Sequence, residues 1–215
     1  MKLDAAAIVT AAAIEQQERG NPGMAMNLES VLVLGIGNLL WADEGFGVRA
    51  VQALHSEWSF HKRVSLLDGG TQGFNLLPFV QDARRMIVFD AIDYGLQPGT
   101  LKVLLNSEVP RFMGSKKLSL HQTGFQEVLA VADLTGALPS ELVLIGVQPE
   151  ELDDFGGTLR SSVRNMIQPA IEIAVRFLQS WGCDPQARAA GLGAAHSLMT
   201  ESLDMAAYEG GRTCQ

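Results

Sequence analysis

The sequence contains only two cysteines among its 215 residues, Cys183 and Cys214. They form no C-x-x-C pair and no disulfide framework, which excludes a disulfide-stapled secreted scaffold and fits a reducing compartment. Neither cysteine has a neighbour that would activate its thiolate, so a thiol protease is not expected. We therefore predict a cytoplasmic protein whose chemistry does not depend on cysteine.

Long apolar runs and an excess of basic residues are also lacking. No apolar run reaches the length of about 18 residues that a membrane-spanning helix needs. The formal net charge is -8, whereas nucleic-acid binding and docking on anionic lipid both require a basic surface. We therefore expect neither nucleic-acid binding nor membrane insertion. We also expect the free chain to be a monomer.

Apolar residues are abundant: 47% of the chain is hydrophobic and 19% is charged, which is enough for a substantial core. Apolar, β-branched runs predict strands at 31–35, 64–68, 86–90, 100–105 and 141–149. Periodic patterns predict helices from about residue 44, at 75–80, at 121–134, and at 160–181 with a kink at Pro169. This alternation predicts a three-layer α/β fold, with a mainly parallel, twisted five-stranded sheet and helices on both faces.

The two ends of the chain differ in composition from its middle. Residues 1–29 begin Ala-rich and are broken at Asn21-Pro22-Gly23, and residues 183–215 are rich in alanine and glycine. We interpret both as flexible appendages. Residues 30–182 then form one domain of ordinary size.

Three side chains are expected to meet at one edge of the sheet. Glu44 follows the first strand, Asp90 ends the third, and His121 opens the helix after the fourth. In open α/β sheets, ligands bind beyond the carboxyl ends of the strands where the strand order reverses, and in a flavodoxin-like order the first and third strands flank that crevice. Two carboxylates and an imidazole suit a divalent transition ion, nickel or zinc included. Affinity should fall below about pH 6.5, since the imidazole binds metal only when neutral.

Each of these residues also has a simpler explanation. The negative charge of Glu44 could complement the partial positive charge at a helix N-terminus, an effect of roughly 0.3–1 kcal/mol. Asp43 is placed to cap the same helix. Asp90 could cap a turn, although a carboxylate ending an apolar run costs several kcal/mol unless it is paired or faces a ligand. His121 alone would more often be a helix cap or a packed histidine. The convergence of all three favours a site.

Two glycine-rich segments need separate treatment. Gly35-Ile36-Gly37 resembles the start of a dinucleotide-binding fingerprint, but Leu40 replaces its third glycine, so a flavin or nucleotide cofactor is disfavoured. The segment Asp68-Gly69-Gly70-Thr71 follows the second strand at the same edge as the predicted site. A plain turn would be sufficient reason for its glycines.

Five long segments carry a resemblance to a known family. They are GIGNLLWADEGFGVR at 35–49, DGGTQG at 68–73, FDAIDYGLQPGTL at 89–101, SLHQTGFQEVL at 119–129 and LIGVQPEELDDFGG at 144–157. Together they resemble the hydrogenase maturation endopeptidases, most closely the enzymes that serve membrane-bound uptake [NiFe]-hydrogenases. The N-terminal extension is the one departure from that pattern.

The resemblance implies a specific activity, which is removal of a C-terminal extension from the hydrogenase large-subunit precursor after nickel insertion. The family's metal-binding positions fall on Glu44, Asp90 and His121, and Asp68 matches a position linked with substrate discrimination. We expect nickel to arrive with the precursor, no organic cofactor, and Asp90 or Asp68 as the general base of an enzyme often grouped with aspartic-type peptidases. A non-catalytic, nickel-sensing chaperone of the large subunit is the alternative.

Overall fold

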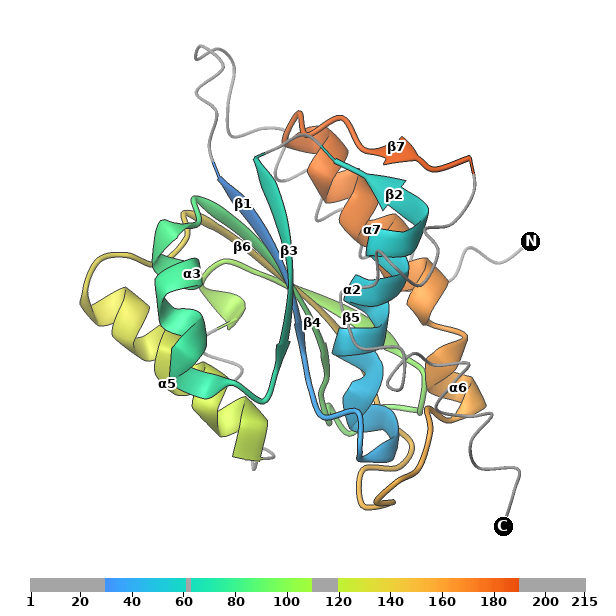
Figure 1. Ribbon diagram of the computed structural model, residues 1–215. Helices are drawn as coiled ribbons and strands as arrows, with labels where there is room; N and C mark the ends of the chain where they lie inside the picture. Colours follow the sequence, from blue (N-terminus) through green and yellow to red (C-terminus); the bar gives the residue numbers. More distant parts are fainter. Residues whose placement is uncertain (1–29, 61–62, 110–119, 190–215) are drawn as a thin grey trace.

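The protein is seen here in a computed structural model that describes residues 30–60, 63–109 and 120–189, without the side chains of residues 120–123. Five strands form the main sheet in the order β3-β1-β4-β6-β5 (Figure 1). Their bounds are β1 Val31–Ile36, β3 Val64–Gly70, β4 Arg85–Ala91, β5 Leu101–Leu105 and β6 Glu141–Val147. All neighbours pair in parallel except β5, which runs antiparallel to β6. The predicted mainly parallel five-stranded sheet is confirmed.

The order of the last two strands departs from the flavodoxin-like arrangement. β6 lies beside β4, and β5 occupies the edge. The connection over residues 92–100 contains no helix and is shorter than the dozen or so residues that a parallel crossover needs. β5 therefore returns antiparallel. The first and third predicted strands, β1 and β4, are still neighbours at the point where the strand order reverses.

Helices cover both faces of the sheet, as predicted. On one face lie α2 (Phe46–Glu57), α6 (Ser161–Arg164) and α7 (Ile167–Ser180); on the other lie α3 (Leu77–Asp82) and α5 (Leu120–Leu134) (Figure 1). The short 3-10 turns η1 (Ala42–Gly45) and η2 (Gly73–Leu76) precede α2 and α3. Two separate groups of buried apolar side chains fill the spaces between the sheet and each helical layer.

The closing helix is interrupted, but not at the predicted place. α6 ends at Arg164 and α7 begins at Ile167, so the expected kink at Pro169 is wrong. Pro169 lies in the first turn of α7, where the backbone N–H that proline lacks would have no partner within the helix. The proline is therefore accommodated without bending α7.

The described fold continues past residue 182. Cys183 is buried, and β7 (Gln186–Ala187) pairs antiparallel with β2 (Trp58–Ser59). Residues 1–29 and 190–215, the greater part of the two predicted appendages, lie outside the described residues. Within the described ranges, no helix combines the length and the apolar character needed to cross a bilayer.

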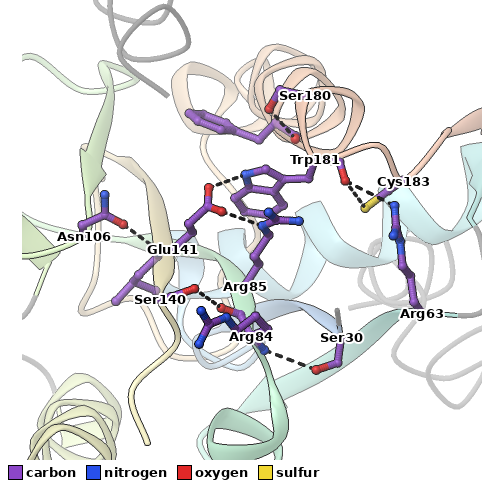
Figure 2. A network of polar contacts seen from close by, with 12 residues as sticks. Ser30, Arg63, Arg84, Arg85, Asn106, Ser140, Glu141, Ser180, Trp181 and Cys183 are labelled. Carbon is purple, nitrogen blue, oxygen red and sulfur yellow. Dashed lines mark hydrogen bonds and ion pairs between the residues drawn. The ribbon is translucent and has the colours of Figure 1, made fainter. Parts of the chain in front are cut away.

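A polar bracket formed by Arg85, Glu141 and Trp181 joins the amino ends of the parallel strands to α7 (Figure 2). The Glu141 carboxylate accepts hydrogen bonds from Arg85 Nε at 2.6 Å and from Trp181 Nε1 at 2.9 Å. Arg63 adds hydrogen bonds to the carbonyl oxygens of Trp181 and Gly182. The bracket lies at the amino ends of the parallel strands, whereas the predicted site lies at their carboxyl ends.

Two glycines let α2 approach the sheet closely. A Cβ added at Gly47 would lie 2.2 Å from the carbonyl oxygens of both Ile36 and Phe89, and one at Gly35 would lie 2.4 Å from the carbonyl oxygen of Gly47. Backbone atoms cannot yield as a side-chain end can. The first turn of α2 therefore lies directly on β1 and β4, which fixes the position of η1 just before it.

Replacing Gly47 by alanine should lower the free energy of unfolding by about 2–4 kcal/mol, because helix and sheet must separate to admit the methyl group. Urea denaturation measures the change. Gly124→Ala is the matched control, since its Cβ would meet only the Cα of Gly73 at 3.4 Å and alanine is favoured inside a helix. Equal stability of the two variants would contradict the close approach.

Candidate functional site

The predicted site residues reach one edge of the sheet. Asp68 in β3 pairs in register with Gly35 of β1, and Gly35 pairs on its other side with Phe89, which precedes Asp90 in β4. Glu44 lies in η1, the turn between β1 and α2. These carboxyl strand ends, η1 and the start of α5 all lie at the bottom of Figure 1.

Glu44 is placed by the absence of a side chain at Gly37. Gly37 has a φ of +137°, and a Cβ there would lie 1.8 Å from the carbonyl oxygen of Glu44. The backbone N–H of Glu44 donates to the carbonyl oxygen of Trp41 at 2.9 Å. The turn that carries the half-buried Glu44 is thus fixed against the end of β1.

Asp43 has a different role from the predicted helix cap. The N-cap of α2 is Gly45, and no side chain caps it. The fully buried Asp43 carboxylate instead accepts three backbone N–H groups, from Glu150 at 2.8 Å, Glu151 at 2.9 Å and Arg160 at 2.7 Å. It ties the 150–160 loop to η1. Sequence reasoning missed this role because its partners are backbone groups more than a hundred residues away.

Asp90 is fully buried near the carboxyl end of β4. Its register partner in β6 is Gly146, and a Cβ at Gly146 would lie 1.9 Å from the hydroxyl oxygen of Tyr94. Burial, and secondarily the negative charge of Asp90, raise the pKa of Tyr94 far above its ordinary value. The Lys102 ammonium lies 4.9 Å from the centre of the Tyr94 ring. Tyr94 therefore stays a neutral phenol close to Asp90.

Gln148 fixes the segment that follows Asp90. Its Oε1 accepts N–H groups from Tyr94 at 2.7 Å and Leu96 at 3.1 Å, and its Nε2 donates to Asp93 Oδ1 at 3.0 Å. The side chain is buried, so its amide group meets its hydrogen-bonding needs within the protein. Its place just beyond the end of β6 was the only sequence signal for this role.

Asp68 is half-buried, and burial raises the pKa of its carboxyl above the ordinary 3.8. The backbone N–H of Gly70 donates to it, and the positive charge of the buried Arg49 acts on it; both lower the pKa and so offset part of the rise. Gly69 and Gly70 belong to β3 rather than to the plain turn considered above. Asp68 therefore takes up a proton more readily than an exposed aspartate.

His121 lies in the first turn of α5, as the sequence predicted. Gly124, one turn further on, sits against Gly73 at the start of η2, so the start of α5 is near the chain that follows β3. The side chain of His121 is outside the described atoms. Its role as a metal ligand stays a prediction, and no group of three potential metal ligands gathers among the side chains that the structure describes.

The glycines of the Gly35-Ile36-Gly37 segment serve packing inside the protein. Both places where a Cβ would stand are filled by the chain's own backbone, by Gly47 at the first and by Glu44 at the second. The first and second glycines of a dinucleotide fingerprint make a tight turn and leave room for a pyrophosphate. Packing inside the protein is therefore a sufficient reason for both glycines, and the expected absence of an organic cofactor stays a prediction.

An open α/β sheet with carboxylates at its topological switch point is typical of ligand-binding proteins and enzymes. Comparison with known proteins identifies the family within this class. The family described as hydrogenase maturation protease (HycI) matches residues 48–177. The chain is 55% identical over 190 residues to the hydrogenase expression/formation protein HoxM of Azotobacter vinelandii, covering 88% of this chain and 90% of that one. It is 57% identical over 182 residues to HupD of Thiocapsa roseopersicina, covering 85% and 82%.

A solved structure agrees with these sequence matches. The hydrogenase maturating endopeptidase HybD from Escherichia coli superposes with a TM-score of 0.70 at 39% identity, covering 74% of this chain and 98% of that one. The chain belongs to the hydrogenase maturation protease family and is a peptidase. The resemblance noted from the sequence motifs, including its uptake-hydrogenase subgroup, is confirmed.

Asp43→Ala should lower the free energy of unfolding by about 3 kcal/mol, because three buried N–H groups lose their acceptor. Hydrogen exchange at the amides of Glu150, Glu151 and Arg160 should accelerate together. Asp153→Ala, an exposed change in the same loop, is the control and should leave these amides protected. Unchanged exchange in Asp43→Ala would show that other contacts hold the loop.

Arg49→Met should raise the pKa of Asp68 further, because the variant removes a positive charge that stabilises the carboxylate. Carboxyl ¹³C NMR titration of Asp68 measures the change. Arg176→Met removes an exposed charge on α7 and should leave the Asp68 titration where it is. A fall in the pKa in Arg49→Met would contradict the assigned sign.

Proposed function

We propose that this protein removes the C-terminal extension of the [NiFe]-hydrogenase large-subunit precursor after nickel has been inserted. It acts in the cytoplasm and is a monomer when free of its substrate. The observation that carries the proposal is the junction of η1 with the end of β4, where Gly37 and Asp43 hold Glu44 at the same edge as the buried Asp90. The family membership supplies the class of reaction.

Glu44, Asp90 and His121 receive the nickel that the precursor carries. Two carboxylates and an imidazole suit a divalent ion of this kind. A fully buried carboxylate at the end of β4 is costly to keep charged, and an arriving cation repays that cost. Because the ion belongs to the substrate, a nickel-free precursor lacks its anchor, and the site checks that nickel is present before cleavage.

Hydrolysis then requires water, a base and a polarised carbonyl. The bound nickel polarises the scissile carbonyl, and water attacks its carbon while giving up a proton to a carboxylate. Asp68 suits this role better than Asp90, because its raised pKa brings its basicity closer to neutral pH and Asp90 is engaged with the ion. The proton passes to the departing amine, leaving a new carboxylate on the large subunit and a free extension peptide.

A cleavage assay on nickel-loaded and nickel-free precursor tests this scheme. Wild-type protein should cleave only the loaded form. His121→Ala and Glu44→Gln should lower kcat/KM by a factor of about 100 or more, since each removes a contact to the ion. Mass spectrometry of the large subunit measures the loss of the extension.

Glu172→Gln, an exposed change on α7, is the control and should cleave normally. Cleavage at the wild-type rate by His121→Ala would refute docking of nickel on the three residues. Binding of the loaded precursor without any cleavage would instead identify a nickel-sensing chaperone.

A further inference from the structure

Two exposed apolar residues lie on neighbouring backbone segments next to Glu44. Leu40 is 42% exposed and Phe155 is 67% exposed. The Phe155 ring meets the half-buried Trp41 edge-on, with ring centres 5.2 Å apart and planes at 66°. We call Leu40, Trp41 and Phe155 the aromatic platform. Large apolar side chains exposed together in this way are characteristic of interaction sites.

The platform is rigidly built. Trp41 and Phe155 form an antiparallel backbone bridge, and the N–H of Gly156 donates to the carbonyl oxygen of Leu40 at 2.6 Å. The Asp43 carboxylate holds both ends of the loop that bears Phe155. An ion pair of 2.9 Å between Asp154 and Arg160 closes the loop internally. Phe155 is therefore held out in water by contacts that do not bury it.

Such an arrangement makes the free protein less stable, but it reduces the conformational entropy that is lost when a partner binds. Burying a phenylalanine side chain is stabilising, and Phe155 largely forgoes that stabilisation in the free protein. An aromatic side chain that is already ordered loses little conformational entropy when a partner covers it. Pre-ordered aromatic anchors of this kind carry much of the affinity at protein interfaces.

The platform adjoins Glu44, one of the predicted site residues. Trp41 accepts the backbone N–H of Glu44 at 2.9 Å, so a partner seated on the platform lies next to Glu44. The loop also carries negative charge, because four of the five residues from Glu150 to Asp154 are acidic. Asp154 is paired with Arg160, whereas Glu150 and Asp153 are exposed. A complementary partner combines apolar side chains with a positive charge.

We infer that the aromatic platform docks an apolar segment of the large-subunit precursor that carries a cationic side chain. The inference rests on the proposed function for the identity of the partner. It adds a second contact to the precursor, independent of the nickel, made by side chains that take no part in the chemistry. Docking here brings the ion of the precursor toward Glu44.

The test separates docking from cleavage by measuring both on the same proteins. Affinity for the nickel-loaded precursor is measured by biolayer interferometry, and KM and kcat by the cleavage assay. Phe155→Ser should raise Kd and KM about tenfold or more and leave kcat unchanged. Phe155→Tyr should restore both constants, because it keeps the ring. Asp153→Asn should weaken association at low salt and reduce its salt dependence.

Phe79→Ser is the matched control, because Phe79 is 50% exposed but lies on α3, across the sheet from the 150–160 loop (Figure 1). It should leave Kd, KM and kcat unchanged. The midpoint of urea unfolding should fall only slightly, and by a similar amount, in both serine variants, since each ring is at least half exposed.

Wild-type affinity in Phe155→Ser, or a loss confined to kcat, would overturn the inference. If wild-type protein binds the precursor without cutting it, and Phe155→Ser still weakens that binding, the proposed function fails while the docking surface stands.

Discussion

The arrangement of the chain around Glu44 depends on one buried carboxylate, that of Asp43. Leaving the Asp43 carboxylate without water costs several kcal/mol unless hydrogen bonds replace its hydration, and three backbone N–H groups do so. Those groups come from both ends of the 150–160 loop, so satisfying the charge also closes the loop onto η1. This set of contacts helps to position η1 with Glu44, holds the loop that bears Phe155, and fixes Arg160, the residue that precedes α6.

Glycines make the complementary contribution by leaving space. Gly47 admits the first turn of α2 onto the sheet, Gly37 admits the carbonyl of Glu44, and Gly146 admits the Tyr94 hydroxyl beside Asp90. In each case backbone or a ring occupies the volume of a missing Cβ. The site is therefore defined as much by close packing of main chain as by its charged side chains, which keeps the carboxylates in place before any substrate arrives.

Much of the fold could be predicted from periodicity alone, because buried parallel strands such as 31–35 and 86–90 have an unmistakable apolar pattern. Their carboxyl ends placed Glu44, Asp68 and Asp90 correctly at one edge. The sequence pattern did not reveal that β5 is the outermost strand, because its place depends both on the length of the connection before it and on which strand it pairs with. The roles of Asp43 and Gln148 were hidden because both bind backbone amides brought near only by folding, and such partners leave no residue-type signal.

The three tryptophans of the chain lie in different surroundings. Trp181 is part of the polar bracket, and Trp58 begins β2 at the end of α2 remote from η1. Trp41 alone adjoins Glu44. Trp58 and Trp181 therefore report on the scaffold, whereas Trp41 reports on the surroundings of Glu44. A variant that keeps Trp41 as its single tryptophan therefore carries a fluorescent reporter beside Glu44.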